Sequence, residues 1–132
     1  MLYVDSSAML KRYVAEHDSA VAIEMMEADP VLITSRLTEV EVRRNLVRLL
    51  DPDDALAAKR QFTQDLDAFA LVSLDHTTCN MAASIAEQTM CRSLDAMHLA
   101  SAQRAGSNTT VLTFDIRQAQ AARSLGLNVI GT

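Results

Sequence analysis

Short apolar runs alternate along this chain with longer amphipathic stretches, and this alternation is the strongest constraint on the fold. The apolar runs have the length of strands and lie at residues 2–4, 31–34, 70–74, 110–114 and 128–130. The second run is rich in β-branched residues, a composition typical of buried parallel strands. Strands that alternate with helices favour a parallel sheet covered by helices on both faces. We therefore expect an α/β protein with three layers, α/β/α, around a short and mostly parallel central sheet.

Local signals indicate where the helices begin and end. Ser6 and Ser7 can cap a first helix that extends to Ala15. Apolar residues spaced by three or four predict a long helix whose one buried face contains Leu37, Val40, Leu46, Val47 and Leu50. Asp51 and Pro52 then favour the start of another helix. This helix is predicted over residues 52–67, and the remaining helices over residues 19–28, 77–91, 93–106 and 115–125.

Length and composition indicate one compact domain. The chain has 132 residues, of which 49% are hydrophobic and 22% charged, as in a typical globular protein. We therefore expect a single domain over residues 1–132. No apolar run reaches the length of a signal peptide or a membrane span, so we expect a cytoplasmic protein without membrane association. Cys79 and Cys91 would lie about 18 Å apart on one helix, so we expect two free, buried thiols.

The net charge of the chain is -5, which argues against a simple DNA-binding module. Proteins that hold nucleic acid mainly by neutralising phosphates carry an excess of lysine and arginine. A nuclease is still compatible with this charge, because divalent cations reverse the local sign of an acidic pocket once they bind.

Four acidic residues occupy positions from which their side chains can converge. Asp5 directly follows the first predicted strand and Asp115 the fourth, whereas Glu41 and Asp95 are expected in the first turns of helices. Open parallel sheets bind ligands beyond the carboxyl ends of their strands. Carboxylates that share such a crevice repel one another unless cations neutralise them, and Mg²⁺ or Mn²⁺ prefers oxygen ligands. A site of this kind hydrolyses phosphodiesters, since the bound ion generates a hydroxide and stabilises the leaving oxygen.

Each of these acids also has a structural explanation. Glu41 ends a short pattern that matches a capping box. Asp95 suits the positive end of a helix dipole, and Asp115 is itself a good N-cap. Asp5 is harder to explain in this way, because a buried acid without a partner is rare. His98, three residues after Asp95, fits a hydrogen-bonded polar residue better than a zinc ligand.

Four segments resemble the motifs of the PIN-domain ribonucleases and, within that family, of the VapC-like toxins of type II toxin–antitoxin systems. The opening segment MLYVDSSA resembles the first motif of the family, and its acid is Asp5. The segment TSRLTEVE resembles the second motif, with its acid at Glu41, and LDAMHLA resembles the third, with its acid at Asp95. The segment VLTFD resembles the fourth motif, with its acid at Asp115 and the hydroxyl of Thr113 beside it. The order and spacing of the four motifs fit over essentially the whole chain.

The resemblance implies a Mg²⁺- or Mn²⁺-dependent endoribonuclease that hydrolyses RNA phosphodiester bonds. It implies that the catalytic and metal-binding residues are Asp5, Glu41, Asp95 and Asp115. It also implies a homodimer and, as a partner, a cognate antitoxin protein that covers the active site. All of these are expectations from the family likeness, which the spacing of the residues alone does not establish.

Other polar residues near the motifs are candidates for supporting roles. We expect the hydroxyls of Ser6 and Thr113 to orient carboxylates through hydrogen bonds, although helix capping and strand packing explain them equally well. Arg36, Arg43 and Arg92 are candidates for contacts with RNA phosphates. The alternative for each arginine is a solvated position on a helix face.

Three other kinds of protein also use an acidic pocket. A receiver-like phosphotransfer domain needs paired acids after the first strand, but two serines follow Asp5. It also needs a lysine late in the chain, whereas the only lysines are Lys11 and Lys59. An aspartate-nucleophile phosphatase needs a second Asp where this chain has Ser7. A non-catalytic domain that binds a basic peptide remains an alternative, although acids at all four motif positions argue against it.

Overall fold

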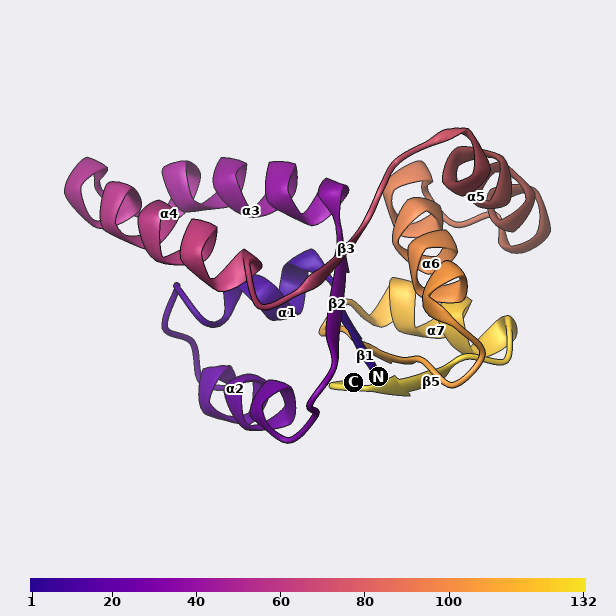
Figure 1. The fold of residues 1–132 in the computed structure, drawn as a ribbon, viewed down its shortest axis with the longest axis horizontal. Coiled ribbons are helices and arrows are strands. Elements are labelled where there is room, and N and C mark those ends of the chain that lie inside the picture. The colour runs from indigo at the N-terminus through magenta and orange to yellow at the C-terminus, as the bar shows by residue number, and fades with distance from the viewer.

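A five-stranded parallel sheet forms the centre of the molecule, with helices on both of its faces (Figure 1). The computed structural model describes residues 1–132. The strands are β1 (Leu2–Val4), β2 (Leu32–Ser35), β3 (Ala70–Val72), β4 (Thr110–Leu112) and β5 (Asn128–Ile130). The helices are α1 (Ser6–Leu10), α2 (Ser19–Glu27), α3 (Arg36–Leu49), α4 (Pro52–Leu66), α5 (His76–Thr89), α6 (Ser93–Ala105) and α7 (Ile116–Ser124). The predicted three-layer α/β/α fold around a parallel sheet is confirmed.

The order of the strands across the sheet places β1 at its centre. The order is β3-β2-β1-β4-β5, and every neighbouring pair is parallel. The chain builds the sheet outward from β1 to β3, crosses to the other side of β1 with β4, and ends at the edge with β5. The direction of winding therefore reverses between β1 and β4. Such a switch point opens a crevice at the carboxyl ends of the strands, where the acids that follow β1 and β4 meet.

Alternating residues of the central strands face two different groups of helices. Leu2 and Val4 of β1 pack in a core with α1, α2, α3 and α4. Tyr3, between them, packs on the opposite face with residues of β2, β4 and α6. Successive strand residues point to opposite sides of a sheet, so one strand supplies both cores. Figure 1 shows the same division, with α1 to α4 on one side of β1 and β2 and α5 to α7 on the other.

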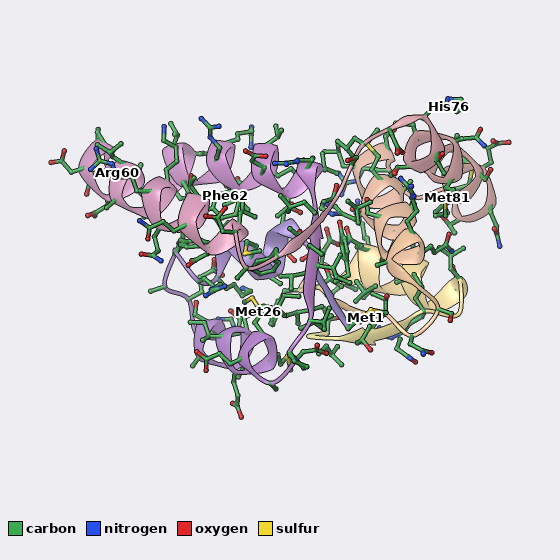
Figure 2. All side chains as sticks on the ribbon, in the orientation of Figure 1. Met1, Met26, Arg60, Phe62, His76 and Met81 are labelled. Atoms are coloured by element: carbon green, nitrogen blue, oxygen red, sulfur yellow. The ribbon has the colours of Figure 1, made fainter.

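The larger core holds α3 and α4 in place beside α1. Phe62 of α4 and Met26 of α2 are buried in this core and lie on the same side of the sheet (Figure 2). Leu46 of α3 and Met9 of α1 are fully buried in the same cluster. Truncating a buried aromatic side chain such as that of Phe62 lowers the free energy of unfolding by about 3–5 kcal/mol. The packing therefore fixes α3, which carries Glu41, relative to β1.

Most predicted elements are confirmed, but several end earlier than expected. α1 ends at Leu10, well before its predicted end, where the Lys11 ammonium turns back to Glu16 and Asp18 at 3.0 and 2.7 Å. These two ion pairs require a turn of the chain that a longer helix would prevent. The N-cap of α1 is Asp5 and not a serine. Strands β3 and β4 are also each two residues shorter at their ends than predicted.

The predicted buried face of α3 is confirmed at Leu37 and Leu46 and wrong at Val40 and Val47. Val40 and Val47 are 65% and 70% exposed, respectively. The buried residues of α3 are Leu37, Thr38, Val42 and Leu46. Thr38 is tolerated in the core because its hydroxyl accepts a hydrogen bond from Thr34 at 2.8 Å. Packing against α1 and the sheet, rather than the distribution of apolar residues, therefore decides which stripe of α3 faces inward.

The two cysteines are free, as predicted, but neither is buried. Cys79 is exposed on α5, and Cys91 is half-buried in the link between α5 and α6. α5 ends at Thr89 because Met90 takes a left-handed conformation (φ 60°, ψ 18°), so the two cysteines do not share a helix. None of the seven helices combines the length and the hydropathy that crossing a membrane requires.

Candidate active site

A cavity at the carboxyl ends of β1 and β4 brings all four candidate acids together. The cavity has a volume of about 250 Å³, and only one of its lining residues is hydrophobic. We call it the acidic pocket, and it is lined by Asp5, Ser6, Ser7, Leu10, Glu41, Asn45, Arg48, Asp95, His98, Asp115 and Gln118. Asp5 and Asp115 are the N-caps of α1 and α7, the helices that follow β1 and β4. Glu41 and Asp95 reach the cavity from α3 and α6.

The prediction that Glu41 lies in the first turn of a helix is wrong. α3 begins directly after β2, and Ser35 caps it by accepting a hydrogen bond from the Leu37 amide at 3.0 Å. Glu41 therefore lies in the second turn and caps nothing, so a capping box does not explain it. Asp95 does lie in the first turn of α6, as predicted.

The Asp5 carboxylate is the most firmly held group in the acidic pocket. It is 2% exposed, and each of its oxygens accepts two hydrogen bonds. Oδ1 accepts from the Ser7 hydroxyl at 2.7 Å and from the Ala8 amide at 2.9 Å. Oδ2 accepts from Thr113 Oγ1 at 2.5 Å and from Gln118 Nε2 at 2.8 Å. Burial raises the pKa of Asp5 above its ordinary value, although a nearby imidazole and these hydrogen bonds oppose the shift.

A buried chain of hydrogen bonds leads from the core to Glu41. Tyr3 Oη lies 2.7 Å from His98 Nδ1, and His98 Nε2 lies 2.6 Å from Glu41 Oε1. Ser6 donates to the same Glu41 oxygen at 2.6 Å. Tyr3 is fully buried, and burial holds the pKa of its phenol far above the ordinary value, so the phenol stays protonated. Because an ionised carboxylate can only accept hydrogen bonds, Nε2 of His98 donates to Glu41.

These hydrogen bonds keep Glu41 ionised. Burial raises the pKa of Glu41, but the hydrogen bonds from His98 and Ser6 outweigh it, and the pKa lies below its ordinary value. His98 is only 3% exposed, and both of its ring nitrogens have partners. It is therefore a hydrogen-bonded polar residue, as the sequence predicts, and it holds one oxygen of Glu41 in place.

The other two acids lack such support. Asp95 is half-buried, and its carboxylate accepts no hydrogen bond from the protein. Burial raises the pKa of Asp95, and the negative charges of Asp115 and Asp5 raise it further, whereas nearby Arg92 and His98 lower it. Asp115 uses only Oδ1, which accepts hydrogen bonds from two amides of α7 at 2.9 and 3.2 Å. Both side chains therefore keep oxygens that no protein group occupies.

The acidic pocket carries more negative than positive charge. Its four carboxylates share the cavity with one guanidinium, that of Arg48, which hydrogen-bonds to Asn45 at 2.9 and 3.1 Å instead. No lysine or arginine forms an ion pair with any of the four acids. Carboxylates that share one cavity without counter-charges favour a bound cation.

The donor set fits a hard divalent cation, but it does not form a closed coordination shell. The candidate ligands are all carboxylate oxygens, the donors that Mg²⁺ and Mn²⁺ prefer. No group of three or more His, Cys, Asp or Glu residues has the spacing of a metal site in this structure. Asp95 makes no hydrogen bond that would resist rotation of its side chain, whereas Asp5 is held in place. The residues therefore fit the ion in their chemistry, and side-chain rotation is needed to gather them around it.

Hydroxyl and amide groups around the acids include residues that the sequence analysis does not find. The hydroxyls of Ser6 and Thr113 donate to carboxylates of the pocket, as described above. Ser7 and Gln118, which are not among the predicted site residues, both donate to Asp5. Gln118 is 2% exposed and lies in the first turn of α7. A polar residue three positions after a motif acid is the signal that could have revealed it.

The three candidate arginines lie in different places, and none of them lines the acidic pocket. Arg36 pairs with Glu39 at 3.1 Å. Arg43 lines a separate groove of about 370 Å³ between α3 and α4. Arg92 lines another pocket, which adjoins the acidic pocket through Asp95. The structure therefore does not bring the three arginines together, and their contacts with RNA stay predictions.

Comparison with known proteins identifies the class to which this fold and pocket belong. The PIN domain family model matches residues 2–124, which is most of the chain, so the chain belongs to the PIN-domain family. Within that family, it is 36% identical to Ribonuclease VapC35 of Mycobacterium tuberculosis. The likeness covers 98% of this chain and 96% of that protein.

Solved structures share the same fold. FitAcB from Neisseria gonorrhoeae gives a TM-score of 0.79 at 18% identity, and the match covers 99% of this chain and 97% of that chain. A toxin–antitoxin complex from Klebsiella pneumoniae gives a TM-score of 0.76 at 14% identity, with the same shares of 99% and 97%. At such identities the likeness concerns the fold alone, and it agrees with the three-layer architecture described above.

Proposed function

We propose that this chain is a metal-dependent endoribonuclease and the toxin of a toxin–antitoxin pair. The observation that carries the proposal is the convergence of four carboxylates on one cavity in which no lysine or arginine pairs with them, namely Asp5, Glu41, Asp95 and Asp115. The likeness to Ribonuclease VapC35 over nearly the whole of both chains supports RNA as the substrate.

In this proposal the four carboxylates hold Mg²⁺ or Mn²⁺. The ion supplies the positive charge that activates water and stabilises the leaving oxygen of the phosphodiester. Asp5 offers a carboxylate whose position is fixed by four hydrogen bonds. His98 and Ser6 orient Glu41 and keep it ionised. Asp95 and Asp115 offer oxygens without protein partners, which can turn toward the ion.

The proposal includes a cognate antitoxin that covers the acidic pocket. The Klebsiella pneumoniae structure with the same fold is a toxin–antitoxin complex, which supports a partner of this kind. We also propose that the chain is one domain over residues 1–132, that it forms a homodimer, and that it acts in the cytoplasm. These three statements rest on the family likeness and on the sequence.

The test compares RNA cleavage by the wild-type, Asp5→Asn and Asp53→Asn proteins. Each purified protein is incubated with total RNA in the presence of Mg²⁺, Mn²⁺ or EDTA, and the cut sites are mapped. We expect cleavage with either ion, no cleavage with EDTA, and a rate about 10³-fold lower for Asp5→Asn. Asp53→Asn removes the same charge from an exposed position on α4, so it should cleave like the wild type.

Two results would contradict the proposal. Equal cleavage by the wild-type and Asp5→Asn proteins would assign the activity to a contaminant and remove Asp5 from the mechanism. A wild-type protein that is folded, as judged by circular dichroism and cooperative unfolding, but cleaves no RNA with either ion would favour a non-catalytic pocket that binds a basic peptide.

A further inference from the structure

A second pocket adjoins the acidic pocket and differs from it in charge. It has a volume of about 360 Å³ and lies between the end of α5, the start of α6 and the outer face of α7. We call it the arginine pocket, and its polar and exposed residues include Met90, Arg92, Asp95, Arg117, Gln120 and Ser124. Two guanidinium groups and a single carboxylate give this lining a net positive charge. The two pockets share Asp95.

Both guanidinium groups of the arginine pocket lack partners. Half of the ten arginines use their side chains in hydrogen bonds or ion pairs, namely Arg12, Arg36, Arg48, Arg104 and Arg123. The side chains of Arg92 and Arg117 make none, although Asp95 lies in the same cavity. A guanidinium offers several N–H donors in a planar fork that matches a phosphate group. Two unpaired guanidinium groups in one cavity therefore suit an anionic phosphate.

The start of α6 adds to the positive potential of this cavity. Arg92 is the N-cap of α6, and no side chain accepts a hydrogen bond from the first turn of the helix. The amides of a first turn lack partners within the helix and favour anions. α7 differs, because Asp115 caps two of its amides. The uncapped end of α6 therefore adds to the positive potential that the two guanidinium groups give the pocket.

Met90 lies at the rim of the arginine pocket in an unusual conformation. It is the one residue other than glycine with a positive φ (60°), and the residue is 84% exposed. The left-handed conformation is strained for any residue that carries a Cβ. A thioether side chain is flexible and packs favourably against aromatic rings. An exposed methionine held beside a phosphate site therefore suits the flat face of a nucleobase.

We propose that the arginine pocket binds the nucleotide next to the scissile phosphate of a single-stranded RNA. Arg92 and Arg117 bind the phosphate of this nucleotide, and Met90 contacts its base. Because Asp95 belongs to both pockets, a strand with one phosphate at the acids brings a neighbouring phosphate to the arginines. The choice of RNA rests on the proposed ribonuclease function. The cavity itself specifies a phosphate next to a flat apolar group.

Binding of RNA in EDTA tests the arginine pocket apart from cleavage. Fluorescence anisotropy gives the Kd of a short fluorescein-labelled single-stranded RNA over a series of salt concentrations. We expect Arg92→Gln and Arg117→Gln each to raise the Kd about 10-fold. Each should also reduce the slope of log Kd against log salt by about 0.7, as the loss of one phosphate contact does for a single strand.

Arg60→Gln is the matched control for the loss of charge. Arg60 is exposed and unpaired like the two pocket arginines, but it lies on α4, across the molecule from α7 (Figure 2). We expect its Kd for RNA to stay within about twofold of the wild-type value, since only the net charge of the protein changes. An Arg60→Gln protein that loses as much affinity as Arg117→Gln would reduce the effect to general electrostatics and overturn the proposal.

Met90→Gly separates a contact with the base from an effect on the fold. Glycine accepts the left-handed conformation without strain, so the Tm of this variant should not fall below the wild-type value. We expect its Kd for the RNA to rise about threefold, and its Kd for an abasic strand of the same length to equal that of the wild type. An equal loss of affinity for both strands would overturn the assignment of Met90 to the base.

The arginine pocket and the proposed function can fail separately. If the wild type binds RNA in the predicted manner but cleaves none, the ribonuclease function fails and the arginine pocket stands. If the wild type cleaves RNA but Arg92→Gln and Arg117→Gln bind it as tightly as Arg60→Gln does, only the pocket proposal is overturned. It is also overturned if these variants lose affinity for a protein partner and keep the wild-type Kd for RNA.

Discussion

The two halves of the acidic pocket differ in how firmly the protein holds their carboxylates. In the fixed half, Asp5 accepts four hydrogen bonds and Glu41 accepts two on a single oxygen. In the free half, Asp95 accepts none, and Asp115 bonds only to amides of its own helix. The fold therefore pre-organises one pair of carboxylates and leaves the other pair to be ordered by whatever binds in the cavity.

Burial explains why Asp5 and Asp95 differ. Asp5 is almost completely buried, and a buried polar group without a hydrogen-bond partner costs about 1–3 kcal/mol. Asp95 is only half-buried, so water can hydrate its carboxylate at little cost. A group that water can satisfy needs no partner from the protein. Asp95 thus remains free to adjust, whereas Glu41, which is also half-buried, is held by the hydrogen bonds from His98 and Ser6.

Loss of one charge from the free half should be as harmful to cleavage as loss of one from the fixed half. We expect Asp95→Asn to lower the single-turnover rate of RNA cleavage about 10³-fold, like Asp5→Asn, because both acids are proposed to hold the same ion. Asparagine keeps the shape of the side chain and removes its charge. An Asp95→Asn protein that cleaves nearly as fast as the wild type would confine the active acids to the fixed half.

Stability should separate the two halves where activity does not. Asp5→Ala leaves the Ala8 amide and the Gln118 side chain without their acceptor and removes the cap of α1, so we expect the free energy of unfolding to fall by about 2–4 kcal/mol. Asp95→Ala removes no hydrogen bond and should leave the free energy of unfolding unchanged or slightly higher. Urea unfolding in EDTA measures both values. Equal losses in the two variants would show that the free half is also held by the fold.

The hydrogen-bond chain behind Glu41 should act on the metal site rather than on the fold alone. We expect Tyr3→Phe, which removes the hydroxyl next to His98, to weaken Mn²⁺ binding about 10-fold in isothermal titration calorimetry. Tyr13→Phe is the matched control, since the Tyr13 hydroxyl donates to Asp65 at 2.6 Å, outside the pocket. If both variants bind Mn²⁺ like the wild type, the chain has only a structural role.

The smallest expected effect is the pH dependence of the free half. The pKa of Asp95 in the folded protein is raised above its ordinary value of 3.8, so ionised Asp95 destabilises the fold at neutral pH. In EDTA, Asp95→Asn should therefore be more stable than the wild type by about 0.5 kcal/mol after solvent screening is allowed for. The difference should shrink as the pH falls through the raised pKa and vanish below 3.8. Thermal unfolding of both proteins over this pH range measures the difference in stability. A difference that stays constant with pH would contradict the raised pKa of Asp95.

Elements that depend on near neighbours could be predicted from the sequence. The alternation of apolar runs and helices predicts the layers, and Asp51 followed by Pro52 correctly marks the start of α4. The buried stripe of α3 could not be predicted in this way, because apolar residues lie on two of its stripes. Val40 and Val47 remain exposed since α1 and the sheet pack against the stripe that contains Val42.

The positions of the acids could be predicted, but their surroundings could not. That Asp5 and Asp115 follow neighbouring parallel strands is enough to expect them at one edge of the sheet. No local pattern shows that the Asp5 carboxylate accepts four hydrogen bonds while that of Asp95 accepts none. Arg92 was a candidate from the sequence, but its place beside Arg117 and Met90 in one pocket was hidden, because no glycine marks the left-handed turn at Met90.

The sequence by itself determined the order of strands and helices and the positions of Asp5 and Asp115 directly after their strands, because periodicity and capping act over a few residues. Only the tertiary structure decided which carboxylate oxygens are occupied. Gln118 reaches Asp5 across 113 positions of the chain, and His98 reaches Glu41 across 57. Such contacts follow from how helices pack on the sheet, which is a property of the whole chain and of no segment alone.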